Sequence, residues 1–161
     1  ASCLAWACAA AATTTNAIKS SHALRIYDRV IVIVEAEVET EGEELAFLEG
    51  STVSRIRKLG KFSEVFAGSR ARPNDADLII TLTVMNARRV GEGRAIVGAL
   101  AGQDKANVRA RLTSATTSET VGELEVVANS DAFFGGPISP SVYQAIDHLV
   151  NEIVKYVSDN Y

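Results

Sequence analysis

Residues 74–127 decide the fold, and they read N-D-A-D-L-I-I-T-L-T-V-M-N-A-R-R-V-G-E-G-R-A-I-V-G-A-L-A-G-Q-D-K-A-N-V-R-A-R-L-T-S-A-T-T-S-E-T-V-G-E-L-E-V-V. Apolar and polar residues alternate at 78–84, at 107–112 and at 123–128, which is the period of a strand with one buried face. Glycines at 91 and 93 end the first run, and a Ser/Thr-rich turn separates the second from the third. The stretch therefore predicts three strands, of which the last two form a hairpin.

Charged residues on the last two runs support antiparallel pairing. Arg109 and Arg111 alternate with the apolar residues of one run, and Glu123 and Glu125 do so on the next. Opposite charges at paired positions stabilise a hairpin, so these charges have a structural use. We therefore interpret the two arginines as part of a solvated sheet face and not as a binding patch.

The segment before this stretch predicts a strand, a helix and a short strand. Residues 26–38 form a β-branched run whose centre is apolar on both faces, as expected for a strand that is covered on both sides. Residues 43–59 then place apolar side chains at helical spacing, and Gly60 stands just past the end as a natural helix terminator. Residues 62–66 are a short strand candidate.

The C-terminal segment predicts a helix that packs against the sheet. Ser139 can cap this helix and Pro140 suits its first position. Its apolar stripe consists of Val142, Ala145, Ile146, Leu149, Val150, Ile153, Val154 and Val157. The predicted fold is therefore α/β (α+β): a mixed, mostly antiparallel sheet of about five strands with two helices packed on one face. A chain of 161 residues with 47% hydrophobic and 22% charged residues suits one domain, which we expect to span residues 23–161.

Residues 1–22 differ in composition from the rest, and we expect them to be an N-terminal signal remnant or tether. They begin A-S-C-L-A-W-A-C and are rich in small residues. Bacterial lipoprotein signals end in small residues before an acylated Cys, so Cys3 and Cys8 are lipidation candidates. The two thiols can instead form a disulfide in an oxidising compartment, and a cytosolic chain with free thiols is the third alternative. A zinc site needs four ligands, and only His22 and His148 remain as further soft donors.

Net charge and hydropathy argue against two classes of function. The formal net charge of −4 is unfavourable for binding duplex nucleic acid, which draws on Lys and Arg to neutralise phosphates. The sequence contains no run of about 18 apolar residues, so no membrane-spanning helix is predicted. We expect a membrane link, if there is one, to be a lipid anchor only.

The Gly-rich elbow at residues 91–102 is the predicted interface. It lacks the Lys-Ser/Thr ending of a phosphate-binding loop, and Ile occupies the position of the third Gly of a dinucleotide motif. Its apolar part is small, uncharged and flanked by strands, which fits either a partner-contacting loop or a buried crossover. The interface candidates are Ala95, Ile96, Val97, Gly98, Leu100 and Gly102.

The catalytic patterns in the sequence favour structural interpretations. Asp147 and His148 are adjacent, and adjacent helical residues point about 100° apart, so the carboxylate is poorly placed to orient the imidazole. We expect His148 to be solvated. Glu41, Glu43 and Glu44 lie at a helix start, where carboxylates favour the helix dipole. No catalytic, cofactor-binding or metal-binding residue is therefore predicted.

Across residues 26–157 the chain resembles a family of bacterial lipoproteins known as domain of unknown function 4410. The resemblance is carried by A-D-L at 76–78, by G-A-L-A-G at 98–102, and by a strand that runs into a Ser/Thr turn. That turn is Thr116, Thr117 and Ser118 here, without the Gly that often follows Thr in the family. More distantly, the element order is similar to that of the small α/β domains of periplasmic assembly lipoproteins. The resemblance implies an envelope location and work in binding or assembly.

These observations predict a non-catalytic bacterial envelope lipoprotein that acts as a binding or assembly module for other envelope proteins. We expect it to be periplasmic or at the cell surface, anchored in the outer membrane by lipid, with envelope proteins or further copies of itself as partners. A homo-oligomer is compatible with this prediction, and no nucleic acid or cofactor is expected. The alternative is a small hydrolase or small-ligand-binding domain with a pocket near the Gly-rich elbow.

Overall fold

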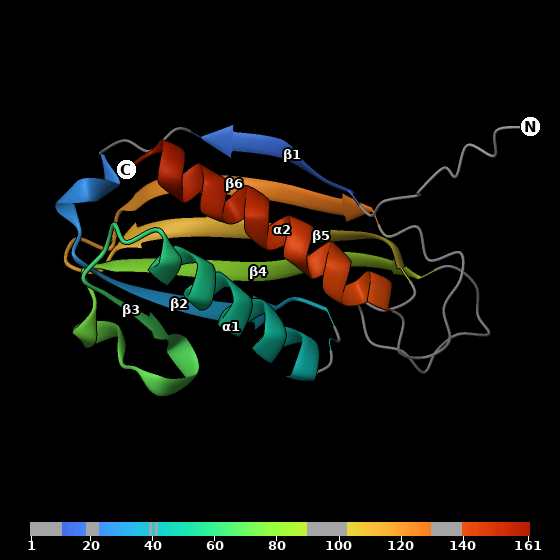
Figure 1. The fold of residues 1–161 in the computed structure, drawn as a ribbon, viewed down its shortest axis with the longest axis horizontal. Coiled ribbons are helices and arrows are strands. Elements are labelled where there is room, and N and C mark those ends of the chain that lie inside the picture. Colours follow the sequence, from blue (N-terminus) through green and yellow to red (C-terminus); the bar gives the residue numbers. More distant parts are fainter. Residues whose placement is uncertain (1–10, 19–22, 39, 41, 90–102, 130–139) are drawn as a thin grey trace, which may run out of the picture.

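Figure 1 shows the computed structural model of the chain, which describes residues 11–18, 23–38, 40, 42–89, 103–129 and 140–161. Over these residues the chain forms six strands and two α-helices, which are β1 (Ala11–Ile18), β2 (Arg29–Ala36), α1 (Gly42–Lys58), β3 (Glu64–Ala67), β4 (Leu78–Arg89), β5 (Gln103–Ser114), β6 (Thr120–Asn129) and α2 (Pro140–Asp159). Three short 3-10 helices accompany them, η1 (Leu24–Ile26), η2 (Gly68–Arg70) and η3 (Pro73–Asp75).

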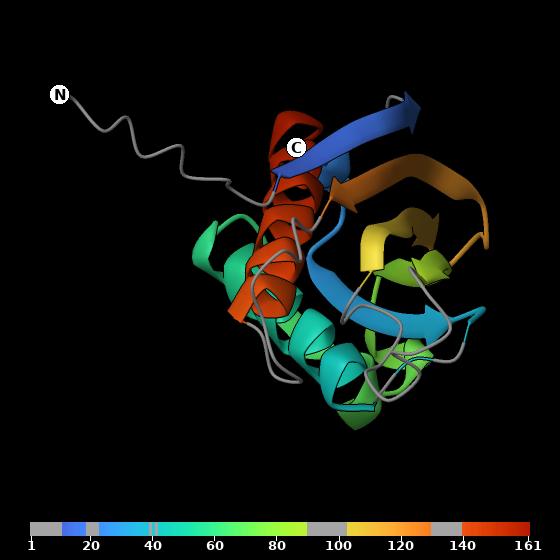
Figure 2. The ribbon, with the colours of Figure 1, turned by 90° about the vertical axis from the view of Figure 1, so that its right-hand side faces the viewer.

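The six strands form one mixed sheet in the order β1-β6-β5-β4-β2-β3. β2 pairs in parallel with β3 on one side and β4 on the other, whereas the β4–β5, β5–β6 and β1–β6 pairs are antiparallel. Both helices lie on one face of the sheet (Figure 2). The predicted α/β fold is confirmed, with six strands among the described residues instead of about five.

The additional strand is β1, which the sequence analysis assigned to the N-terminal segment at 1–22. It pairs with β6 in antiparallel register from Ala11 opposite Asn129 to Ile18 opposite Glu123. The sheet therefore includes residues before the expected domain start at 23. Its sequence, A-A-T-T-T-N-A-I, shows no apolar alternation, and its place in the sheet depends on a partner more than 100 residues away, so the period of the segment gave no strand signal.

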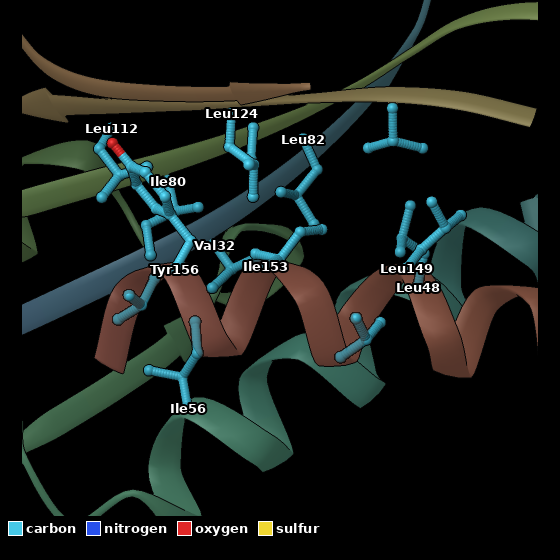
Figure 3. Packing of buried hydrophobic residues seen from close by; sticks show 14 of the residues in the cluster. Val32, Leu48, Ile56, Ile80, Leu82, Leu112, Leu124, Leu149, Ile153 and Tyr156 are labelled. Carbon is cyan, nitrogen blue, oxygen red and sulfur yellow. The ribbon is translucent and has the colours of Figure 1, made fainter. Parts of the chain in front are cut away.

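The inner face of the sheet carries the alternation that the sequence predicted. The apolar residues of each run are fully buried in β4, β5 and β6, with Ile80, Leu112 and Leu124 in adjacent strands (Figure 3). In α1, Leu48, Val53 and Ile56 are buried, and Gly60 has φ +63° just after the helix end. The expected helix stripe and its left-handed terminating glycine are confirmed.

Helix α2 begins at the expected Pro140 and lies over the centre of the sheet (Figure 1). The described members of its predicted stripe are buried, except for the partly buried Val154, and the fully covered ones include Leu149, Val150 and Ile153. Tyr156 joins the same core from the last turns of the helix. Burial raises the pKa of the Tyr156 hydroxyl above its ordinary value. The helix layer and the sheet therefore share one hydrophobic core.

The opposite face of the sheet is covered near β2. Ile31 is fully buried although its neighbours in sequence point to the helix layer, so the predicted cover on both faces is present at this position. The segment with η2 and η3 contacts β2 on its way from β3 to β4. A Cβ atom added to Gly68 would lie 2.8 Å from Ile33 Cγ1 and 3.0 Å from the Val32 carbonyl oxygen. Gly68 is thus needed for the close approach of the crossover to β2.

Candidate functional site

A polar groove of about 410 Å³ lies on the face of the sheet opposite the helices. It is formed by residues from β2, β4 and β5 and by one residue just after β2, and its lining is Glu35, Ala36, Glu37, Thr81, Thr83, Arg109, Arg111 and Thr113. The inner positions of these strands are apolar, so strand alternation places the polar set on this face. The groove thus contains both acidic and basic side chains, contributed by β2 and the residue after it and by β5.

The strand register explains how these side chains meet. Glu35 in β2 pairs with Thr83 in β4, and Thr83 pairs with Arg109 in β5. One step along, Thr81 pairs with Arg111. The strand β4, which carries both threonines, therefore lies between β2, which carries Glu35, and β5, which carries the two arginines.

The predicted cross-strand charge pairs of the hairpin are confirmed. Arg109 lies opposite Glu125 and Arg111 lies opposite Glu123 in the β5–β6 register. Arg111 Nε is 3.0 Å from Glu123 Oε2, and Arg109 Nε is 3.8 Å from the other oxygen of the same carboxylate. These pairs are partly exposed, and such pairs typically contribute less than about 1 kcal/mol each.

Arg109 is less well satisfied than its neighbour. Its cross-strand partner Glu125 accepts a hydrogen bond of 2.7 Å from Asn107 Nδ2. Arg109 Nε is buried and has no hydrogen-bond partner among the described residues, and the same holds for Asn107 Oδ1. A buried donor without a hydrogen-bond partner costs free energy, so the end of the groove at Arg109 differs from the rest in having an unpaired donor.

The described residues bring together no catalytic constellation. Asp147 Oδ1 accepts a hydrogen bond of 2.7 Å from Arg55 Nη2, so this carboxylate is engaged with α1 and does not orient His148. His148 is partly buried, whereas the sequence analysis expected it to be solvated. Across the described ranges, no group of three or more His, Cys, Asp or Glu side chains is placed to hold a metal ion.

The ion pair between Arg29 and Asp77 serves the fold. Arg29 Nη2 lies 3.1 Å from Asp77 Oδ1, and the Arg29 backbone N–H donates to Asp77 Oδ2 at 3.0 Å. The hydrogen bond from the guanidinium lowers the pKa of the Asp77 carboxyl below its ordinary value. Because Asp77 precedes β4 and Arg29 starts β2, the pair joins the beginnings of two parallel strands.

The predicted lipidation, disulfide and interface residues lie outside the described part of the chain. This applies to Cys3 and Cys8 and to the whole of 95–102. The strand ends that flank these segments are described: Ala11 pairs with Asn129, and Arg89 pairs with Gln103. The start of β1, the end of β4, the start of β5 and the end of β6 therefore belong to one end of the sheet (Figure 1).

The described residues form an α/β domain with a six-stranded mixed sheet and two helices on one face. Solved structures with TM-scores above 0.5 share this fold, among them the following two. PelC from Paraburkholderia phytofirmans, a dodecamer, aligns with a TM-score of 0.61 at 16% identity, covering 91% of this chain and 96% of PelC. XCC0632 from Xanthomonas campestris, a DUF330 protein, aligns with a TM-score of 0.53 at 15% identity, covering 80% and 81% of the two chains. At these identities the likeness shows the fold.

A third solved structure, lipoprotein GNA1162 from Neisseria meningitidis, has a TM-score of 0.44 at 12% identity, covering 80% of this chain and 99% of that one. The sequence matches no protein-family model and no curated protein. The resemblance to domain of unknown function 4410 therefore stays a prediction.

None of the helices in the described ranges is long and apolar enough to cross a membrane.

Sequence reasoning named the arginines of the groove but missed the groove itself. Glu35 and Glu37 belong to it because β4 pairs with both β2 and β5. That strand order depends on the crossover through η2 and η3, and the sequence carries no signal for it. The available signal was the pair of threonines at 81 and 83, which face the same side as Arg109 and Arg111.

Proposed function

We propose that this chain is a non-catalytic module of the bacterial envelope that acts by self-association and by binding other envelope proteins. The observation that carries the proposal is the fold shared with PelC over nearly the full length of both chains, because PelC forms a dodecamer. We assign no catalytic role to the groove, and we treat the threonine and glutamate side chains there, such as Thr83 and Glu35, as polar side chains of a sheet face.

The proposal includes a lipid anchor on Cys3 or Cys8 that holds the protein at a membrane surface. Cys8 is three residues before the start of β1 at Ala11, so an extended linker spans about 10 Å. A lipid on Cys8 would hold the end of the sheet where β1 starts and β4 ends close to the headgroups. If Cys3 carries the lipid instead, the eight residue steps between Cys3 and Ala11 allow these two residues to lie up to about 28 Å apart.

Fractionation of cells that express the natural gene tests the location. The parent protein is expected in the membrane fraction, and it should be released only by detergent. Replacement of the acylated cysteine by serine should move the protein to the soluble fraction, while the same change at the other cysteine should have no effect. A parent protein that is fully soluble after cell lysis would refute the anchored location.

Chemical cross-linking in intact cells tests the assembly role. Amine-reactive cross-linking followed by mass spectrometry should recover peptides of this chain linked to further copies of itself or to envelope proteins. The matched control is the soluble serine variant, in which links to membrane-bound partners should be lost. Recovery of only intramolecular links at high expression would contradict an assembly role.

A small-ligand-binding role is the second candidate, and the specific observation in its favour is that Arg109 Nε, beside the polar groove, has no hydrogen-bond partner among the described residues. A ligand with carboxylate or hydroxyl acceptors would complete the hydrogen bonds of this side chain. Thermal-shift screening of sugar acids and dicarboxylates tests this role, with Arg109→Gln as the comparison. Stabilisation of the parent protein and not of the variant is the expected result, and equal shifts for both proteins would exclude the groove.

A further inference from the structure

The two edges of the sheet differ in their protection. β3 is the edge strand on one side and is only four residues long. Arg57 Nη2 donates a hydrogen bond of 2.6 Å to the Val65 carbonyl oxygen, and Glu49 accepts hydrogen bonds from the Ser69 N–H and hydroxyl just after the strand. Short length and nearby charged side chains are the usual means by which natural sheets protect an edge.

β1 is the edge strand on the other side, and it is eight residues long with the sequence A-A-T-T-T-N-A-I. It contains no charged residue. In the described part of the chain, β6 is its only sheet neighbour. Alternate backbone N–H and C=O groups of an edge strand point away from the sheet, so β1 presents hydrogen-bonding groups on a strand whose own residues carry no charge.

β1 is firmly attached on its inner side. Ala12 packs against the hydrophobic core, and Thr14 Oγ1 donates a hydrogen bond of 3.0 Å to Glu152 Oε2 in α2. Figure 2 shows β1 continuing the curved sheet beside β6, at the margin of the molecule. A strand held in this way is preorganised to accept a further strand at its outer edge.

We propose that β1 pairs with β1 of a second copy of this chain, antiparallel across a two-fold axis, so that two sheets become one. The inference rests on the self-association proposed above and adds where and how it occurs. Because charged side chains protect the β3 edge, the edge that best matches β1 is another β1. Two-fold pairing brings identical residues close together, so any charge on the strand would meet a like charge, and β1 has none.

The position of a β-bulge sets the register of this pairing. The β1–β6 register shifts between Thr14 and Asn16, and Thr15 Oγ1 donates to the Glu125 carbonyl oxygen at 3.3 Å. Bulges twist an edge and disturb pairing locally, so we centre the pairing on the regular stretch before the bulge. We place the two-fold axis at Thr13, whose exposed side chain points to the outer face.

A cross-linking experiment follows from this register. In a two-fold antiparallel pair the central residue lies opposite its own copy, with Cα atoms about 4.5–5.5 Å apart. That separation lies within the range of about 4.4–6.8 Å that a disulfide spans. Thr13→Cys, made in the full chain with both natural cysteines replaced by serine, should therefore form a covalent dimer on mild oxidation. The matched control is Glu64→Cys on the β3 edge, which is also exposed and should stay monomeric under reducing-agent-free electrophoresis.

A charge substitution tests the same edge without cross-linking. Thr13→Lys should weaken dimerisation about fivefold, because two like charges would face each other across the axis. High salt should restore most of this loss. Thr13→Val is the control, since it keeps a β-branched, uncharged side chain and should dimerise like the parent. Circular dichroism shows whether each variant is folded.

The outcomes separate the pairing from the self-association. If the protein oligomerises but Thr13→Cys is not cross-linked and Thr13→Lys has no effect, the β1 pairing is wrong and the self-association stands. A disulfide that forms only when Thr13→Cys and Glu64→Cys chains are mixed would show head-to-tail pairing and overturn the two-fold arrangement. A parent protein that is monomeric at every concentration would overturn both.

Discussion

Replacement of Leu149 by alanine tests whether α2 and the sheet share one core. Leu149 is fully buried in the layer between α2 and the sheet (Figure 3). The change removes three carbon atoms, which at about 0.8 kcal/mol each gives roughly 2.4 kcal/mol of transfer free energy. A cavity left in a well-packed core adds to this, so we expect the free energy of unfolding to fall by about 3–4 kcal/mol. Leu149→Asp should cost more and leave the domain unfolded.

Urea unfolding followed by circular dichroism measures this loss, with all proteins at one concentration because oligomerisation adds to apparent stability. The expected loss corresponds to a fall in Tm of roughly 6–16 °C for a chain of this size. His148→Ala is the control, since the adjacent side chain is only partly buried and its removal should change the free energy of unfolding by less than about 1 kcal/mol. A Leu149→Ala protein that melts with the parent would refute the shared core.

Three further predictions concern the crossover, an ion pair and the N-terminus. Gly68→Ala should lower the free energy of unfolding by about 1–3 kcal/mol because the new methyl group meets β2, whereas Gly50→Ala, in a helix with open space, should raise it by about 0.5–1 kcal/mol. The folded pKa of Asp77 is below its ordinary value of 3.8, so its ion pair stabilises the fold at neutral pH and loses this effect as the pH falls through the folded pKa. Urea titrations should therefore show Asp77→Asn less stable than the parent at pH 7 and nearly equal to it in strong acid; a constant difference would contradict the ion pair's role. Intact-mass analysis of the protein from cell membranes should show an acylated chain. Of the two single variants Cys3→Ser and Cys8→Ser, one should lose the acyl group and the other should keep it; an unmodified parent mass would refute the anchor.

The inner layer was predictable from the sequence because its periods are strong. Leu78, Ile80 and Leu82 alternate without interruption, and the α2 stripe keeps helical spacing from Ala145 to Val157. Each pattern allows only one way to bury a continuous apolar surface. The β5–β6 hairpin was predictable as well, since opposite charges occupied positions that pair directly.

Features that depend on distant partners were not predictable in the same way. β1 has no apolar period and becomes a strand because β6 offers it an edge. Phe62 was expected in the short strand, but it lies just before β3 and is buried in the core. The polar groove needs β4 between β2 and β5, which follows from a crossover and not from any local pattern. Long-range strand order is therefore the information that the residues alone did not provide.

Light scattering coupled to size-exclusion chromatography measures the central claim, self-association, most directly. One chain has a mass of 17.1 kDa. We predict that the parent protein elutes with a mass that rises with concentration to an even multiple of this value, as expected if two-fold pairs are the unit of assembly. A single species of 17.1 kDa at every concentration, with the protein folded by circular dichroism, would contradict the account.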